Sequence, residues 1–180
     1  MRVLGVRHGA TRVADDATVS GDMSRRSRDE RALLREAVRL ACENAERREQ
    51  PFGALVVRDG RVVGTGVSTI LRDGDPMAHA EVAAVRDACR SLGTLDLRGA
   101  MLACSCEPCP MCHAAAVLAG ISRIVYAATK DTAARHGFAL SGVAADMQST
   151  WRAKRLDPVE HVPTEGADEP FVRFDERART

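Results

Sequence analysis

The chain has 180 residues, a hydrophobic fraction of 45% and a formal net charge of +1. This length and composition predict one domain with a sizeable core. The near-zero charge argues against nucleic acid as a partner. No apolar run is long enough to span a membrane, so we expect no membrane association.

The first 27 residues show no sustained hydrophobic period, and we expect them to form a flexible N-terminal arm. They also lack the apolar core of a signal peptide. We therefore expect a cytoplasmic protein, in a reducing compartment where the six cysteines do not form disulfides.

Apolar residues at helical spacing predict a helix from Asp29 to about Arg47. Two β-rich runs follow at 54–57 and 62–67, and the Asp59-Gly60 pair between them predicts a hairpin. A polar loop then leads to the next helix.

That helix begins at His79 and is expected to end near Gly93. A short apolar run at 101–104 predicts a buried strand, a helix follows with 114–118 as its body, and 121–127 predicts another strand. This order predicts an α/β fold, a three-layer α-β-α sandwich with a mixed central sheet of about five strands.

After Ala128 the pattern predicts a short helix that ends at Gly137 and a longer one over 145–155. Residues 157–180 form a charged C-terminal tail that contains one apolar cluster around Phe171. The expected organisation is therefore an arm (1–27), a domain (28–156) and a tail (157–180).

Metal-binding residues stand at the starts of two of these helices. Cys109 and Cys112 have the Cys-x-x-Cys spacing that lets two sulfur atoms share one ion. Pro110 suits a first helical position, so both thiols are expected in the first turn, where the positive helix end favours thiolate. His79 is the best third ligand. One histidine and two cysteines leave a position open for water, which is typical of a catalytic Zn²⁺ site.

Glu81 follows His79 by two residues, so it can point toward the metal without binding it. A carboxylate there can take a proton from the activated water and pass it on, and we predict that Glu81 is the catalytic residue. The alternative is a closed structural zinc site with His113 or Cys106 as a fourth ligand, which would leave Glu81 without a task.

His79-Ala80-Glu81 together with Pro108-Cys109-Pro110-Met111-Cys112 resembles the signature of the zinc-dependent cytidine deaminase superfamily. Within it, Pro51-Phe52-Gly53-Ala54, 75–81 and 105–109 are most similar to bacterial guanine deaminases, followed by tRNA wobble-adenosine deaminases. The resemblance covers about 51–138. It implies a zinc-dependent hydrolytic deaminase that forms a homodimer, with the C-terminal tail covering an active site of its own chain or of its partner.

The resemblance and the residue types suggest where a nucleobase-like substrate would bind. Phe52 is the expected stacking face, and small neighbours let backbone groups approach a planar ring. The backbone amides at the two helix starts can donate to developing negative charge. The full set of expected substrate contacts is Phe52, Gly53, Ala54, Ser68, Ala80 and Pro108.

Three positions depart from the guanine deaminase pattern. Ser68 stands where an asparagine is usual, and Ala139 and Leu140 stand where two aspartates are usual. A site built for other hydrogen-bonding groups rejects a poorly matched ligand. We therefore predict a free amino-heterocycle of the guanine, isoguanine, cytosine or aminotriazine type. The alternatives are a tRNA wobble-adenosine deaminase, a nucleoside or nucleotide deaminase, and a non-catalytic zinc module.

Overall fold

The computed structural model describes residues 16–140, 142–154 and 159–179, and within them five strands form one mixed sheet. The spatial order of the strands is β2 (Arg61–Val67), β1 (Gly53–Arg58), β3 (Met101–Cys106), β4 (Arg123–Ala128) and β5 (Val159–His161). The β2–β1 and β1–β3 pairs are antiparallel, whereas the β3–β4 and β4–β5 pairs are parallel. The predicted mixed sheet is confirmed, although the sequence did not locate β5.

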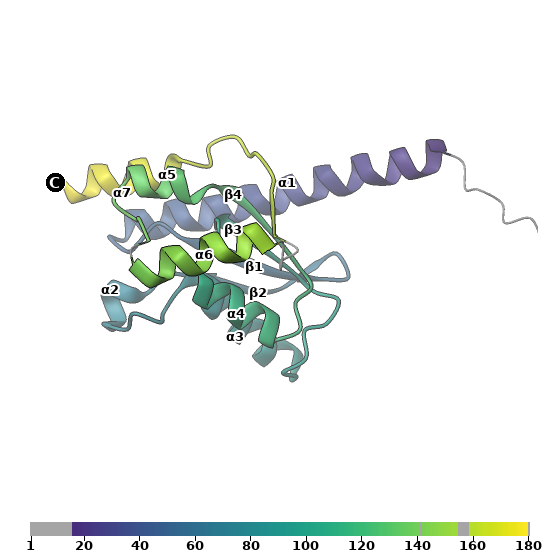
Figure 1. Cartoon of the computed structure of the whole chain (residues 1–180), viewed down its shortest axis with the longest axis horizontal. Helices are drawn as coiled ribbons and strands as arrows, with labels where there is room; N and C mark the ends of the chain where they lie inside the picture. Colours follow the sequence, from purple (N-terminus) through teal and green to yellow (C-terminus); the bar gives the residue numbers. More distant parts are fainter. Residues whose placement is uncertain (1–15, 141, 155–158, 180) are drawn as a thin grey trace, which may run out of the picture.

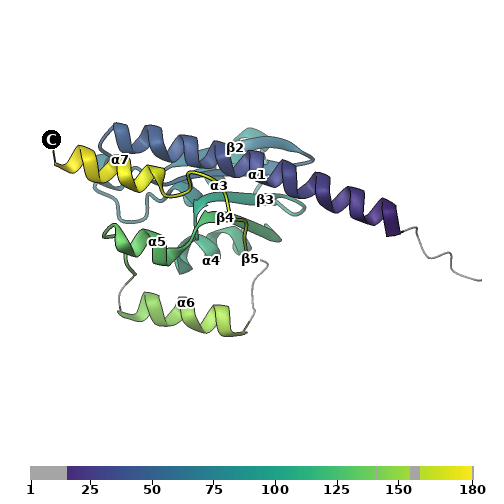
Figure 2. The same ribbon diagram turned by 90° about the horizontal axis from the view of Figure 1, so that it is seen from above.

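Helices cover both faces of this sheet (Figures 1 and 2). On β1, Leu55 and Val57 pack with helix α1 (Asp16–Glu46), while Ala54 and Val56 pack with α3 (Ala80–Leu92) on the opposite face. This alternation follows from the two-residue period of a strand, and it confirms the three-layer sandwich. The remaining helices are α2 (Ile70–Asp73), α4 (Pro110–Leu118), α5 (Lys130–Arg135), α6 (Gly142–Lys154) and α7 (Glu169–Ala178).

The predicted helix start at Asp29 is wrong, because α1 begins at Asp16. Residues 16–27, which we expected in a flexible arm, are therefore helical, and residues 1–15 lie outside the described part of the chain. The N-terminal part of α1 extends past the sheet in Figure 1. A helix segment that extends past the sheet needs no apolar stripe, so hydrophobic periodicity does not predict it.

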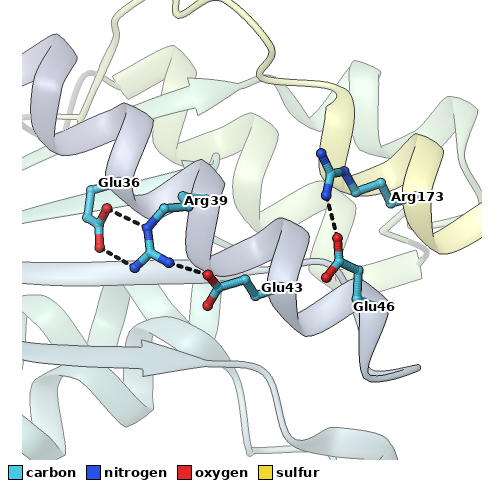
Figure 3. Close-up of polar contacts among 5 residues, drawn as sticks. All are labelled: Glu36, Arg39, Glu43, Glu46 and Arg173. Carbon is cyan, nitrogen blue, oxygen red and sulfur yellow. Dashed lines mark hydrogen bonds and ion pairs between the residues drawn. The ribbon is translucent and has the colours of Figure 1, made fainter.

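The C-terminal segment packs on its own chain, where α7 lies beside α1 (Figure 2). Phe171 is almost fully buried, and its ring centroid lies 5.7 Å from that of Phe52. Arg173 pairs with Glu46 of α1, as Figure 3 shows. This pair is half-exposed and adds little stability, so the burial of Phe171 holds the segment in place. Within the described residues, no helix is long and apolar enough to cross a membrane.

The surface of α1 carries a second set of ion pairs in Figure 3. Arg39 contacts Glu36 at 2.6 Å and also pairs with Glu43, each about one helical turn away. Because these side chains are exposed to solvent, the pairs add little to the stability of the helix.

Two glycines in β2 let helix α3 approach the sheet closely. A Cβ atom at Gly66 would lie 2.2 Å from the carbonyl oxygen of Ala80 and 2.4 Å from the backbone nitrogen of Ala84. Gly64 has equally close contacts further along the same helix. Because α3 carries His79 and Glu81 at its start, these glycines set the position of the two residues.

We expect Gly66→Ala to lower the free energy of unfolding by about 1–3 kcal/mol, because the added methyl group overpacks a backbone contact. Urea denaturation of the purified variant measures the change. Thr65→Ala is the matched control, since Thr65 is exposed on the same strand. Equal stability of the two variants would contradict the close-approach explanation.

Candidate active site

The predicted metal ligands meet at the starts of helices α3 and α4. His79 is the N-cap residue of α3, and Cys109 is the N-cap residue of α4, each with extended backbone. Pro110 occupies the first turn of α4 as expected, and Cys112 lies in the same turn. The two helices contact each other on one face of the sheet, which brings their N-terminal ends together.

The three donor atoms have separations that suit one tetrahedral zinc ion. Nδ1 of His79 lies 3.3 Å from Sγ of Cys112 and 3.7 Å from Sγ of Cys109, and the two sulfurs are 3.4 Å apart. With zinc bonds of about 2.3 Å to sulfur and about 2.0 Å to nitrogen, tetrahedral geometry places two sulfur atoms about 3.8 Å apart and a sulfur and a nitrogen about 3.5 Å apart, within about 0.4 Å of these separations. The residues therefore fit the ion.

Among the described residues, these three side chains form the one group of three or more histidine, cysteine or acidic side chains that could hold a metal ion. Cys106, a possible fourth ligand in the closed-site alternative, instead directs its thiol to the carbonyl oxygen of Thr129 at 3.8 Å. His113 is buried and is not part of the group. This arrangement favours a site with an open position.

The two cysteines share one proton when no metal is present. The hydrogen bond from Cys112 lowers the pKa of Cys109 to about 3, and the same contact raises the pKa of Cys112. A metal ion must displace that shared proton before both sulfurs can act as thiolates.

Zinc affinity is therefore expected to fall as the pH is lowered between about pH 8 and pH 6, by about tenfold per pH unit for each proton displaced. Competition with a chromophoric chelator at several pH values measures this slope. An affinity that does not change with pH would show that the thiols are already ionised without metal.

Glu81 lies in the first turn of α3 and is 8% exposed. Burial raises its pKa above that of an ordinary glutamate, and the nearby Cys109 raises it further, whereas Lys130 opposes the shift. A raised pKa makes this carboxylate a better acceptor for a proton from water. This behaviour suits the proton-transfer role that we predict for Glu81.

Ser68, one of the expected substrate contacts, is fully buried next to Phe52. Its backbone N–H donates to the carbonyl oxygen of Phe52 at 3.1 Å, and its own carbonyl accepts from Nδ2 of Asn44 at 2.8 Å. Its hydroxyl group has no hydrogen-bond partner among the described residues. A buried hydroxyl without a partner is unfavourable, which makes Ser68 an unusual position in this part of the core. Its contact with substrate stays a prediction.

Phe52 belongs to an aromatic cluster rather than standing alone. Its ring is perpendicular to that of Phe138, with centroids 5.2 Å apart, and the amino group of Lys130 lies over it at 5.8 Å. The close approach of α1 explains why residue 53 is a glycine. An added Cβ at Gly53 would lie 2.5 Å from the carbonyl oxygen of Ala37 in α1. Its N–H donates to the hydroxyl of Ser105. The stacking role of Phe52 remains a prediction.

Ala54, Ala80 and Pro108, the other expected contacts, are all buried. Ala80 is the first residue of α3, directly after the ligand His79. Pro108 precedes Cys109, and its carbonyl oxygen accepts from Nε2 of Gln148 at 3.3 Å. The structure thus places Ala80 and Pro108 beside the metal ligands, while Ala54 lies within the sheet.

Comparison with known families identifies the chain's relatives. The model for the cytidine and deoxycytidylate deaminase zinc-binding region matches residues 27–128. This match includes all three metal ligands and Glu81. The chain belongs to this family. It is therefore a zinc-dependent hydrolytic deaminase, with His79, Cys109 and Cys112 as its possible metal-binding group.

Several relatives of this deaminase have different activities. It is 44% identical over 107 residues to the guanine deaminase of Bacillus subtilis, covering 59% of this chain and 69% of that protein. It is 38% identical to a tRNA-specific adenosine deaminase of Aquifex aeolicus, covering 53% of this chain and 64% of that one. It is also 45% identical to part of a tRNA(Ile)-lysidine synthase of Deinococcus radiodurans, but this match spans 67% of this chain and only 20% of the synthase.

Solved structures agree with the fold. The deaminase superimposes on a mutant of NE0047 in complex with 8-azaguanine with a TM-score of 0.70 and 25% identity, covering 84% of this chain and 85% of that one. The crystal structure of Bacillus subtilis guanine deaminase gives a TM-score of 0.58 and 34% identity, covering 69% and 92% of the two chains.

Lys130 is a residue of the deaminase site that the sequence did not reveal. It begins α5, and its half-buried side chain reaches over Phe52. Burial lowers the pKa of Lys130, but Cys106, Glu81 and the metal-binding thiols together raise it above the usual value. In the sequence, the one indication is that Lys130 follows the strand that precedes α5. This position alone does not predict a role for the residue.

Proposed function

We propose that this deaminase acts on a free nucleobase or a related amino-heterocycle of the guanine, isoguanine, cytosine or aminotriazine type. The reaction replaces an amino group by oxygen from water and releases ammonia. The observation that carries the proposal is the group of three metal ligands, with a position left for water, beside the buried carboxyl of Glu81.

Bound zinc supplies an acidified water at neutral pH. Glu81 would accept one proton from this water and deliver it to the ring nitrogen, and would then carry the second proton, from the added hydroxyl group, to the amine, which leaves as ammonia. The backbone N–H groups at the starts of α3 and α4 can stabilise negative charge that develops on the ring. Ser68 and Phe52 hold the ring in place in this proposal.

The C-terminal helix supports a small substrate over a macromolecular one. Phe171 packs against Phe52 and Phe138, so α7 covers one side of the region where the ring would lie. The identity with the guanine deaminase of Bacillus subtilis is consistent with this choice. This chain lacks the asparagine and the two aspartates that are usual in guanine deaminases. We therefore propose guanine as one member of the substrate class and not as the established substrate.

A tRNA adenosine deaminase is the second candidate, supported by the identity with tRNA-specific adenosine deaminases and with part of a tRNA(Ile)-lysidine synthase. The net charge of +1 argues against it, because phosphate contacts require clustered positive charge. A nucleoside or nucleotide deaminase is a further alternative, which would need space for a ribose.

An assay of ammonia release tests these candidates directly. The zinc-loaded protein is incubated with guanine, isoguanine, cytosine and aminotriazines, and in parallel with their nucleosides and with unmodified tRNA. The proposal expects turnover on at least one free heterocycle, with a higher kcat/KM than on its nucleoside. Turnover on tRNA alone, with a steep dependence on salt, would refute it.

We also infer a homodimer in the cytoplasm. On α4, Val117 and Leu118 are 52% and 88% exposed, which suits burial in a contact between two copies. The six cysteines suit a reducing compartment, where thiols remain free to bind a metal. Light scattering of the wild-type protein and of Leu118→Glu measures the assembly. A monomeric wild-type protein would contradict the dimer.

A further inference from the structure

Asn44 links two chain segments that carry predicted substrate contacts. It lies in the last turn of α1 and is 2% exposed. Its Nδ2 donates to the carbonyl oxygen of Gln50 at 2.8 Å and to that of Ser68 at 2.8 Å. Gln50 lies two residues before Phe52, and Ser68 directly follows β2. One buried side-chain amide therefore holds the segment before β1 and the segment after β2 against the end of α1.

The side-chain nitrogen of Asn44 uses both of its hydrogens in this link. An asparagine amide nitrogen has two donor hydrogens, and each of the two hydrogen bonds takes one. Because both neighbours are carbonyl oxygens, only the nitrogen of the amide can face them. The backbone carbonyl oxygen of Asn44 also accepts from the backbone N–H of Glu49 at 3.1 Å. Asn44 thus fixes the turn by which the chain leaves α1 toward Phe52.

The two linked segments also contact each other directly. The backbone N–H of Ser68 donates to the carbonyl oxygen of Phe52 at 3.1 Å. The backbone N–H of Phe52 donates in turn to the carbonyl oxygen of Gln50 at 2.8 Å. With the two bonds from Asn44, these contacts form a closed network around the backbone of Phe52. The members of a buried network depend on one another, because a group that loses its partner there has no water to replace it.

Glu49 extends the link to helix α2. Its buried carboxylate accepts from the backbone N–H of Arg72 at 2.6 Å and from that of Leu71 at 3.2 Å. The metal ligand His79 is held differently, because it begins α3, which packs closely on Gly66 of β2. The link from the end of α1 therefore acts on the segments that carry the predicted ring contacts and not on the metal ligands.

We propose that Asn44 is a positioning residue that holds segments 50–52 and 68–72 as one unit, so that their substrate contacts meet the ring together. The inference rests on the proposed function, which assigns ring contacts to both segments, and it adds the residue that sets their relative position. Asn44 acts through the two segments and does not touch the substrate. Its loss weakens ring binding, while the zinc ligands and Glu81 stay in place.

Steady-state kinetics and zinc analysis of Asn44→Ala test the proposal. We expect KM for a heterocycle that the wild-type protein turns over to rise about 10-fold, because two buried hydrogen bonds are lost. The values of kcat and of zinc content should stay near those of the wild type. Asn44→Gln keeps both donors on a longer side chain and should recover part of the KM. Val38→Ala is the matched control, since Val38 is a buried core residue on the same helix. It should lower the free energy of unfolding and leave KM unchanged.

Amide hydrogen exchange of the zinc-loaded proteins gives a second readout that needs no turnover. In Asn44→Ala, exchange in 50–52 and 68–72 should become faster in both segments, and by more than in Val38→Ala. If the alanine variant does not fold, Asn44→Gln provides the same comparison.

Three results would overturn the inference and leave the proposed function intact. They are an unchanged KM in Asn44→Ala, an equal rise of KM in Val38→Ala, and faster exchange in only one of the two segments. A wild-type protein that turns over no free heterocycle refutes the proposed function instead. In that case, faster exchange of both segments would still support Asn44 as the link between them.

Discussion

Replacing Glu81 by glutamine is expected to lower kcat by about 10²- to 10⁴-fold while the protein keeps its zinc. The glutamine side chain has nearly the same shape but cannot accept the proton from water or return it to the amine. Glu81 is buried and is not one of the three metal ligands, so the metal content should stay at one ion per chain. Ammonia release and metal analysis of the same preparation measure both quantities.

The matched control is Asp87→Asn, which makes the same chemical change on the same helix. Asp87 lies well away from the start of α3, where its Oδ2 accepts from the backbone N–H of Thr65. We expect this variant to keep wild-type kcat. If Glu81→Gln retains full turnover with zinc bound, Glu81 does not carry protons and the proposed mechanism is wrong.

Replacing Cys112 by alanine is expected to remove zinc and to bring turnover to the level of the buffer blank. Loss of a residue that merely supports a metal ligand already lowers affinity by about 10- to 100-fold, and loss of the ligand itself should exceed this. Without the ion, the pKa of the water molecule is not lowered. Glu81 is then too weak a base to remove a proton from it. Zinc content and ammonia release report the two effects together.

Cys89→Ala serves as the control for losing a thiol. Cys89 lies on α3 and packs at the edge of the core, apart from the three-ligand group. We expect this variant to bind one zinc ion and to retain activity. Removal of zinc from the wild-type protein with a chelator should mimic Cys112→Ala, and added zinc should restore turnover to the wild-type protein only. Activity in a metal-free preparation would exclude a zinc-dependent reaction.

The metal-binding residues could be predicted from sequence because local rules fix them. Pro110 marks the start of a helix, Gly93 ends one in a left-handed conformation, and the Cys-x-x-Cys spacing leaves little choice of geometry. The hairpin was predictable for the same reason, since Asp59 and Gly60 both adopt positive φ. Each of these signals depends on only a few neighbouring residues.

The features that the sequence did not reveal depend on distant contacts. Helix α7 owes its place to the burial of Phe171 against aromatic residues from elsewhere in the chain. Lys130 gains its position through Glu107, which is far from it in sequence. The N-terminal part of α1 carries no apolar stripe to detect. A period or a motif describes local order, and it does not identify partners across the fold.

The most direct test of the central claim is to follow oxygen from water into the product. The zinc-loaded protein is incubated with a substrate from the panel in water enriched in ¹⁸O. The mass of the product is measured by mass spectrometry, and the ammonia released is quantified in the same sample. Hydrolytic deamination predicts one ¹⁸O atom in the product for each molecule of ammonia released. Glu81→Gln should form the labelled product only at its lowered rate. Ammonia release without incorporation of the label would contradict attack by water at this site.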